Sequence, residues 1–176
     1  KQNLIIFVKA PVPGRVKTRL VPPLSHEEAA RLYRAWAKQI FSEALKLKEA
    51  TVQVAYEPDH EMPAPGWLNE NSGTFPFFLQ EGSDLEQKML HAFEASFRNG
   101  FDKILLIGSD SPGLPIDFIQ QGFKALDEND LVLGPTPDGG YYLIGLSAKT
   151  GSSRSCRSSP CALSARASAE TLHPPS

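Results

Sequence analysis

The sequence predicts an α/β fold, a sandwich of helices around a mostly parallel sheet. Residues 4–8 and 103–107 are short apolar runs of the kind that forms strands buried on both faces. Segments with helical spacing alternate with segments of strand type along residues 1–146, and the sequence contains no internal repeat. Parallel neighbours need a crossover connection, so this alternation favours a parallel sheet.

The first half of the chain contains three predicted strands and one long helix. The strand at residues 4–8 runs into a loop rich in proline and glycine. Ser25 and Glu28 have the spacing of a capping box, and apolar residues at helical spacing follow through about residue 48. Alternation predicts the second strand over residues 51–56, and the third is expected over residues 75–79.

The second half adds two helices and three strands. A second capping box, Ser83 with Glu86, opens a helix that ends near Gly100. Pro115, at a first helical position, starts another helix that continues to about Asp127. The strands are expected over residues 103–107, 131–133 and 141–146, and the last two flank the turn Asp138-Gly139-Gly140.

Size and charge exclude several classes of protein. The 176 residues fit one domain, and the net charge of −2 provides no global basic field for a nucleic acid polymer. No apolar run approaches the roughly 20 residues of a membrane span, and no signal peptide precedes the first strand, so we expect a cytoplasmic protein. The two cysteines and four histidines lack metal-site spacing, so any metal is expected on carboxylates.

The composition changes abruptly at residue 147. Residues 147–176 contain nine serines, four basic residues against one acidic residue, and no Ile, Val, Phe, Tyr or Trp. Such a segment cannot bury a core face, so we expect residues 1–146 to form the domain and residues 147–176 to form a disordered tail rich in Ser, Arg, Ala and Pro. The change also favours a frameshifted or truncated origin of the tail, which the reading frame of the encoding DNA would test.

The loop after the first strand gathers positive charge. It contains four cations and no acid: Lys9, Arg15, Lys17 and Arg19. Ligands of open α/β sheets bind beyond the carboxyl ends of the strands, so these cations are placed to meet a phosphate or diphosphate, and Gly14 would allow a close backbone approach. The alternative is a solvated basic turn, because the loop matches neither the Walker nor the dinucleotide fingerprint.

A carboxylate follows the buried strand at residues 103–107. Gly108, Ser109 and Asp110 come directly after that strand. A carboxylate there suits Mg²⁺ or Mn²⁺, because hard cations take oxygen ligands and often keep substrate phosphates in their coordination shell. The alternative is that Asp110 caps the turn that leads into the next helix.

The third segment, residues 134–146, contains Asp138-Gly139-Gly140. This triplet is typical of a turn between two strands. The functional alternative places Asp138 in the same crevice as Asp110, where it is the best candidate for a general base, with the two glycines opening space for a substrate.

In this order and with these separations, the segments resemble the nucleotide-diphospho-sugar transferase superfamily, the type A glycosyltransferase fold. The nearest resemblance is to its small bacterial branch of glycosyltransferases and molybdenum-cofactor-guanylyltransferase-like proteins. It is carried by residues 9–20, 82–85 with Met89, 108–112 and 134–146. The resemblance implies a Rossmann-like three-layer sandwich whose C-terminal part is missing after residue 146.

The resemblance also implies roles for individual residues. The loop at Pro11 to Arg19 would wrap the nucleotide, with Lys17 and Arg19 facing its phosphates. Lys9, Ala10, Pro11 and Gly14 are expected to bind the nucleotide as well. Further binding residues are Ser109, Gly139 and Gly140. Asp110 corresponds to the metal ligand, and the residues expected to act in catalysis are Lys17, Asp110 and Asp138. One departure is that the usual Asp-x-Asp is Ser109-Asp110-Ser111 here, so a second metal ligand must come from elsewhere.

The implied activity is that of a transferase. It would depend on Mg²⁺ or Mn²⁺ and would move a group from a nucleotide or nucleotide-sugar donor to a small acceptor. Glycosyl transfer from a nucleotide-diphospho-sugar is the leading interpretation. Guanylyltransferase-like nucleotidyl transfer is the alternative, because both reactions need phosphate charge neutralised and reactants held in line. A nucleotide-binding remnant without catalysis is the third, because the tail replaces the part of the family that completes the site.

Overall fold

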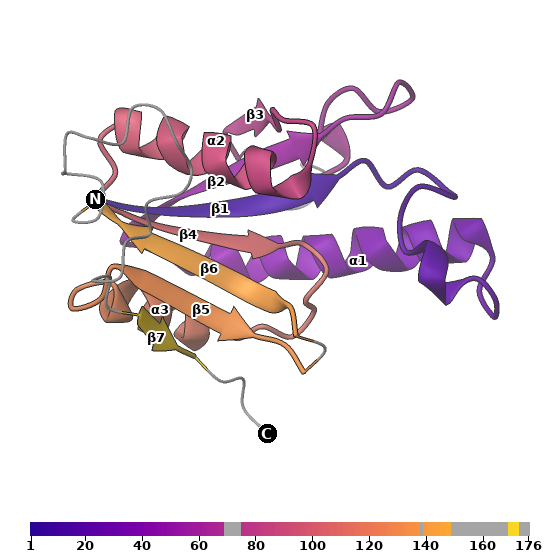
Figure 1. The fold of residues 1–176 in the computed structure, drawn as a ribbon. Coiled ribbons are helices and arrows are strands. Elements are labelled where there is room, and N and C mark those ends of the chain that lie inside the picture. Colours follow the sequence, from indigo (N-terminus) through magenta and orange to yellow (C-terminus); the bar gives the residue numbers. More distant parts are fainter. Residues whose placement is uncertain (69–74, 138, 149–168, 173–176) are drawn as a thin grey trace.

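The computed structural model describes residues 1–68, 75–137, 139–148 and 169–172, and these form an α/β sandwich (Figure 1). A seven-stranded sheet runs through the molecule in the order β3-β2-β1-β4-β6-β5-β7. Four of its six strand pairings are parallel. The predicted fold class, a three-layer sandwich with a mostly parallel sheet, is therefore confirmed.

The predicted elements between residues 1 and 147 all form, with boundaries close to those expected. The strands are β1 (Gln2–Lys9), β2 (Ala50–Glu57), β3 (Phe77–Leu79), β4 (Lys103–Gly108), β5 (Leu131–Pro135) and β6 (Tyr141–Ser147), with β7 (Ala169–Thr171) further on. The helices are α1 (His26–Ala44), α2 (Leu85–Arg98) and α3 (Ile116–Ala125). Two short 3-10 helices, η1 (Thr18–Leu20) and η2 (Gly66–Leu68), lie in loops.

The sheet has a parallel part and a mixed part. Strands β3, β2, β1 and β4 are parallel neighbours, whereas β6 is antiparallel to both β4 and β5. The chain leaves β1 toward β2 and leaves β4 toward the β5 side of the sheet. The loops after these two central strands therefore diverge, which opens a crevice at the carboxyl ends of β1 and β4.

Helices cover both faces of the sheet (Figure 1). Leu4, Ile6 and Val8 of β1 belong to the larger core, together with α1 and α3. Ile5 points to the other face, where it joins a smaller core with α2. All four side chains are fully buried, as their continuous apolar run predicted. Among the described residues, no helix is both long enough and apolar enough to cross a bilayer.

The helix starts follow the sequence at α1 and deviate at the other two helices. Ser25 accepts from the Glu28 amide and Glu28 accepts from the Ser25 amide, so the predicted capping box is confirmed. At α2 the N-cap is Asp84, which accepts from the Gln87 amide at 2.8 Å, and the predicted capping box at Ser83 is wrong. An aspartate is as good an N-cap as a serine, so adjacent candidates compete. At α3, Pro115 occupies the N-cap and not the first helical position.

Part of the serine-rich segment joins the sheet. Strand β7 pairs in parallel with β5, and Leu172 beyond it is 9% exposed and belongs to the larger core. The Tyr142 hydroxyl donates to the Leu172 carbonyl at 3.2 Å. The expectation of a disordered tail is therefore wrong for residues 169–172, because strand pairing uses backbone groups that every composition provides. The rest of the tail beyond residue 148 lies outside the described residues.

Candidate active site

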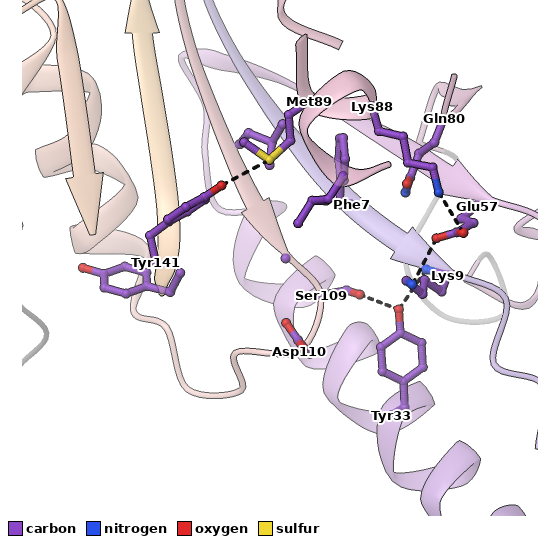
Figure 2. A pocket seen from close by; sticks show the side chains of 14 residues that line it. Phe7, Lys9, Tyr33, Glu57, Gln80, Lys88, Met89, Ser109, Asp110 and Tyr141 are labelled. Carbon is purple, nitrogen blue, oxygen red and sulfur yellow. Dashed lines mark hydrogen bonds and ion pairs between the residues drawn. The ribbon is translucent and has the colours of Figure 1, made fainter. Parts of the chain in front are cut away.

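A cavity of about 370 Å³ lies at the carboxyl ends of β1, β2 and β4 (Figure 2). Its position is the crevice between the diverging loops of β1 and β4, where open α/β sheets bind their ligands. The polar residues that line it are Lys9, Tyr33, Glu57, Gln80, Lys88, Ser109 and Asp110. Its apolar side chains are Phe7, Leu85, Met89 and Leu106, with Tyr141 and Tyr142 beside them.

Asp110 is held by a cation from the basic loop. The Lys17 ammonium lies 2.9 Å from Oδ2 of Asp110, which brings together two residues that are 93 positions apart in the sequence. The same ammonium lies 5.0 Å from the ring centroid of Trp36, on α1. The structure thus brings Lys17 of the basic loop against the carboxylate that follows β4, while the predicted roles of the two residues toward a phosphate and a metal stay predictions.

The backbone on both sides of this ion pair is specialised. Lys17 is the one residue other than glycine with a positive φ in the described chain, at 50°, and Val16 before it is buried against Ala30 and Tyr33. A Cβ atom on Gly108 would lie 2.7 Å from Oδ1 of Asp110, far closer than such contacts allow. Gly108 therefore lets the carboxylate fold back against the end of β4.

Tyr33 of α1 ties the two diverging strands together beneath the cavity. Its hydroxyl accepts from the Lys9 amide at 2.9 Å and shares a 2.7 Å hydrogen bond with Ser109 Oγ. Burial raises the pKa of the Tyr33 phenol, and the hydrogen bonds from Ser109 and Lys9 only partly oppose this. Tyr33 is therefore neutral at physiological pH and bridges the ends of β1 and β4. Ser109 uses its hydroxyl in this bridge.

Glu57, at the end of β2, is the second carboxylate of the cavity and is held by two lysines (Figure 2). Lys88 Nζ lies 2.8 Å from its Oε1 and Lys9 Nζ lies 3.3 Å from its Oε2. Burial raises the pKa of the Glu57 carboxyl, but the hydrogen bonds and charges of Lys88 and Lys9 outweigh it and hold the pKa below its ordinary value. Glu57 is therefore ionised at neutral pH and is a poor general base.

The other predicted loop residues lie at different depths. Ala10 and Pro11 form the start of the loop and are buried, so any ligand contact with them would involve the backbone. Gly14 has a φ of 78°, which favours glycine, and Arg19 lies exposed on η1. Of the loop residues, Lys9 lines the cavity and Lys17 reaches it through Asp110.

The third predicted segment forms the turn between β5 and β6. The Gly139 amide donates to the Thr136 carbonyl at 3.0 Å, and the Thr136 amide donates to the Gly140 carbonyl at 2.9 Å. Both glycines are exposed, and the two tyrosines that follow them line the cavity. Asp138 lies outside the described residues, so its role as a general base stays a prediction.

Sequence reasoning missed four polar residues that line the cavity: Tyr33, Glu57, Gln80 and Lys88. Tyr33 reads as one position of an amphipathic helix, and Glu57 reads as the last polar residue of a strand. Lys88 sits one turn inside α2, where a lysine is an ordinary surface residue. Only Glu57 carried a usable signal, because the carboxyl end of a parallel strand next to β1 is where the crevice opens.

Two places on the described chain offer carboxylates to a metal ion. Asp59, His60 and Glu61 bring their ligand atoms within 4.8 Å of one another, but Asp59 Oδ1 already contacts His60 Nδ1 at 2.8 Å and the cluster does not line the cavity. Asp110 lines the cavity, and its side chain is 55% exposed. A single strand-end carboxylate of this kind fits Mg²⁺ or Mn²⁺, which take one or two carboxylates and complete their shell with substrate phosphates and water.

Comparison with known proteins identifies relatives of the whole fold. Residues 40–158 match a family of uncharacterised bacterial proteins, DUF2064. A crystal structure from Desulfovibrio desulfuricans G20, provisionally assigned as a nucleotide-diphospho-sugar transferase, is 31% identical, with a TM-score of 0.84 over 98% of this chain and 79% of that one. Comparison with curated proteins returned no match.

More distant structures share the fold alone. The 4-diphosphocytidyl-2C-methyl-D-erythritol synthase of Anaerococcus prevotii DSM 20548 is 12% identical, with a TM-score of 0.56 over 84% of this chain and 70% of the synthase. Rv0371c of Mycobacterium tuberculosis H37Rv, solved in complex with manganese, is 10% identical, with a TM-score of 0.51 over 98% of this chain and 87% of that protein. The fold is therefore shared by proteins whose sequences differ widely from this chain.

Proposed function

Because the chain belongs to the nucleotide-diphospho-sugar transferase superfamily and to the bacterial family DUF2064, we propose that it is a metal-dependent transferase with a nucleotide-activated donor. The proposed donor is a nucleotide-diphospho-sugar, and the proposed reaction is glycosyl transfer to a small acceptor. The observation that carries the proposal is the contact between Lys17 and Asp110 at the switch point between β1 and β4. Phosphate-binding cations and a metal-binding carboxylate are the two components that a diphosphate site requires.

The chemistry asks the site to stabilise a departing diphosphate. In glycosyl transfer the bond between the anomeric carbon and the phosphate oxygen breaks, and the leaving nucleoside diphosphate gains negative charge. The residues proposed to neutralise that charge are Lys9 and Lys17, because preorganised cations stabilise charge that develops in the transition state. The acceptor hydroxyl forms the new bond and loses its proton to a base, for which Asp138 is the proposed candidate.

The proposed cofactor is Mg²⁺ or Mn²⁺ on Asp110. Such an ion would act as a Lewis acid on the diphosphate oxygens. The exposed carboxylate of Asp110 supports this assignment, and the manganese complex of Rv0371c supports a divalent ion within this fold. Glu57 lines the same cavity but is held by Lys9 and Lys88, so Asp110 is the proposed first ligand.

Nucleotidyl transfer is the second candidate, and a neighbour whose name describes a diphosphocytidyl product favours it. In that reaction the bond between the α- and β-phosphates of a nucleoside triphosphate breaks, and pyrophosphate leaves. An oxygen of the acceptor forms the new bond to the α-phosphate. Both reactions need cations beside the phosphates of the leaving group, which is a nucleoside diphosphate in glycosyl transfer and pyrophosphate in nucleotidyl transfer. Release of a nucleoside diphosphate supports glycosyl transfer, and release of pyrophosphate supports nucleotidyl transfer.

The first experiment measures the melting temperature of the purified chain with nucleoside triphosphates, nucleoside diphosphates and nucleotide sugars, each with and without Mn²⁺. A ligand at about 100 times its dissociation constant adds about 2.7 kcal/mol to the free energy of unfolding, which a domain of this size shows as a rise of several degrees. A metal-dependent rise with one nucleotide class supports the proposal and identifies the donor. Cooperative melting without any rise would contradict it, and binding without turnover would indicate a remnant that has lost catalysis.

A further inference from the structure

We propose that the ion pair with Lys17 keeps Asp110 from binding a free divalent metal ion. The site therefore accepts the metal together with a diphosphate, as the metal chelate of the nucleotide, and not as the free ion beforehand. The inference rests on the proposed function and adds to it the chemical form of the ligand and the order of binding. It follows from the contacts of Lys17, which already satisfy the carboxylate that the metal needs.

Lys17 occupies one of the two oxygens of the Asp110 carboxylate, and the other lies against Gly108. Oδ1 of Asp110 is folded back against Gly108, where an added Cβ would lie only 2.7 Å away. Oδ2 is the oxygen that the Lys17 ammonium contacts at 2.9 Å. A metal ion that arrives alone and binds Oδ2 must therefore compete with the Lys17 ammonium.

Sharing this oxygen is unfavourable when no anion is present. Mg²⁺ binds carboxylate oxygens at about 2.1 Å, so an ion on Oδ2 would lie within roughly 5 Å of the ammonium. Three positive charges would then face a single negative charge across a short distance. A diphosphate changes this balance, because its oxygens can bind the metal and the ammonium together.

The structure also holds Lys17 in place beside Asp110 when no ligand is bound. The side chain of Lys17 is 23% exposed, because the carboxylate lies at its ammonium and the ring of Trp36 lies beside it. Its backbone has a φ of 50°, in the left-handed region that a lysine rarely adopts. Burial of Val16 against Ala30 and Tyr33 fixes the chain at the preceding residue. A conformation of this kind persists only where the surrounding contacts determine it.

The test measures Mn²⁺ binding without any nucleotide, by electron paramagnetic resonance of the free ion, in the full chain and in Lys17→Met. We expect Lys17→Met to bind free Mn²⁺ about threefold more tightly, the scale of a partly exposed ion pair. The same variant should bind a nucleoside diphosphate with Mn²⁺ at least tenfold more weakly, because a charged hydrogen bond to phosphate is lost. Tighter binding of free Mn²⁺ together with weaker binding of the nucleotide with Mn²⁺ is the result expected if Lys17 moves from Asp110 to a phosphate oxygen.

Asp110→Asn provides the reciprocal measurement. Removing the carboxylate releases Lys17, so we expect metal-free nucleoside diphosphate to bind about threefold more tightly to this variant, while the effect of Mn²⁺ on that binding disappears. This variant keeps the side-chain shape at an exposed position, so it tests the proposal even if Lys17→Met does not fold. Lys46→Met is the matched control, because Lys46 pairs with Glu43 outside the cavity, and both affinities should stay unchanged.

Trp36 reports the exchange directly. In a Trp67→Phe background Trp36 is the only tryptophan, and we expect addition of the metal–nucleotide chelate to change its fluorescence when Lys17 is present and not when it is Met. Equal Mn²⁺ affinity of the full chain and Lys17→Met, in protein that binds the chelate, would overturn this inference and leave the proposed function standing. Failure of the full chain to bind any nucleotide with Mn²⁺ would overturn both.

Discussion

Two carboxylates of the described residues line the cavity, and their surroundings differ. Glu57 contacts two lysines, at 2.8 and 3.3 Å, and its side chain is 33% exposed. Asp110 contacts one lysine at 2.9 Å and is 55% exposed. Both acids lie at the carboxyl ends of parallel strands, Glu57 as the last residue of β2 and Asp110 just beyond β4. The difference therefore comes from the loops and from α2, which supplies Lys88.

This difference separates a structural acid from an acid that can exchange partners. The partners of Glu57 satisfy both of its oxygens, and losing the carboxylate would leave two lysines without a counter-charge. Loss of the Asp110 carboxylate would leave one lysine, Lys17, without this partner, and Lys17 already lies beside the ring of Trp36. A carboxylate with one exchangeable partner is the better candidate for a ligand that comes and goes.

The largest expected effect is a loss of turnover when Asp110 is substituted, greater than the loss when Glu57 is substituted. We expect Asp110→Asn to lower metal-dependent turnover about 100-fold, because it removes the proposed ligand's charge. Its free energy of unfolding should change by less than about 0.5 kcal/mol, since the ion pair is exposed. Initial rates with the donor found in the melting experiment, and thermal unfolding without ligand, measure the two quantities.

Glu57→Gln is the matched variant and should show the opposite pattern. We expect a fall of about 1 kcal/mol in the free energy of unfolding, or about 2–4 °C in melting temperature, because Lys88 and Lys9 lose their partner. Turnover should fall less than in Asp110→Asn. If Glu57→Gln loses turnover while keeping its stability, the roles that we assign to the two acids are reversed.

A smaller effect is expected at the bridge between the strands that carry Lys9 and Asp110. Tyr33→Phe removes a buried hydroxyl with two partners, Ser109 Oγ and the Lys9 amide, and should lower the free energy of unfolding by about 1 kcal/mol. Tyr141→Phe is the control, because its hydroxyl contacts the Met89 sulfur at 3.5 Å, and it should cost less than about 0.3 kcal/mol. Equal melting temperatures for the two variants would contradict a bridging role for Tyr33.

The smallest expected effect is a pH dependence that belongs to Glu57. The folded-state pKa of this carboxyl lies below its ordinary value of 4.5, so its contribution to stability is present above that value and is lost as the pH falls through the folded-state pKa. We therefore expect the difference in melting temperature between the natural chain and Glu57→Gln to be constant from pH 7 to 5 and to shrink below about pH 4.5. A difference that grows in acid would contradict the ion-pair explanation.

Much of the fold could be predicted because its signals are local. Apolar runs such as residues 4–8 place the buried strands, and the Ser25 capping box places the start of α1. The order of the strands could not be read, because pairing of β1 with β4 depends on contacts across about 100 residues. Strand β7 was missed for a related reason, since its pairing with β5 involves backbone and not composition.

The candidate site was predicted in part. The basic loop and Asp110 could be named because several unusual residues cluster in the sequence, and the structure brings Lys17 and Asp110 together. Tyr33 and Lys88 could not be named, because each is a single ordinary residue on an amphipathic helix. Their importance arises only when α1 and α2 pack on opposite faces of the sheet and deliver them to one cavity.

The pairing of β5 with β7 has a consequence for biosynthesis. Strand β5 pairs with β6 on one side, but its outer edge pairs with residues 169–171. A nascent chain therefore exposes that edge while the ribosome makes the intervening residues, which takes roughly 2–7 s at ordinary synthesis rates. Open strand edges are templates for pairing with other chains. The yield of folded protein during rapid overexpression should thus depend on how soon β7 emerges from the ribosome. Slower synthesis at lower temperature would lengthen the time during which chaperones must protect the open edge of β5.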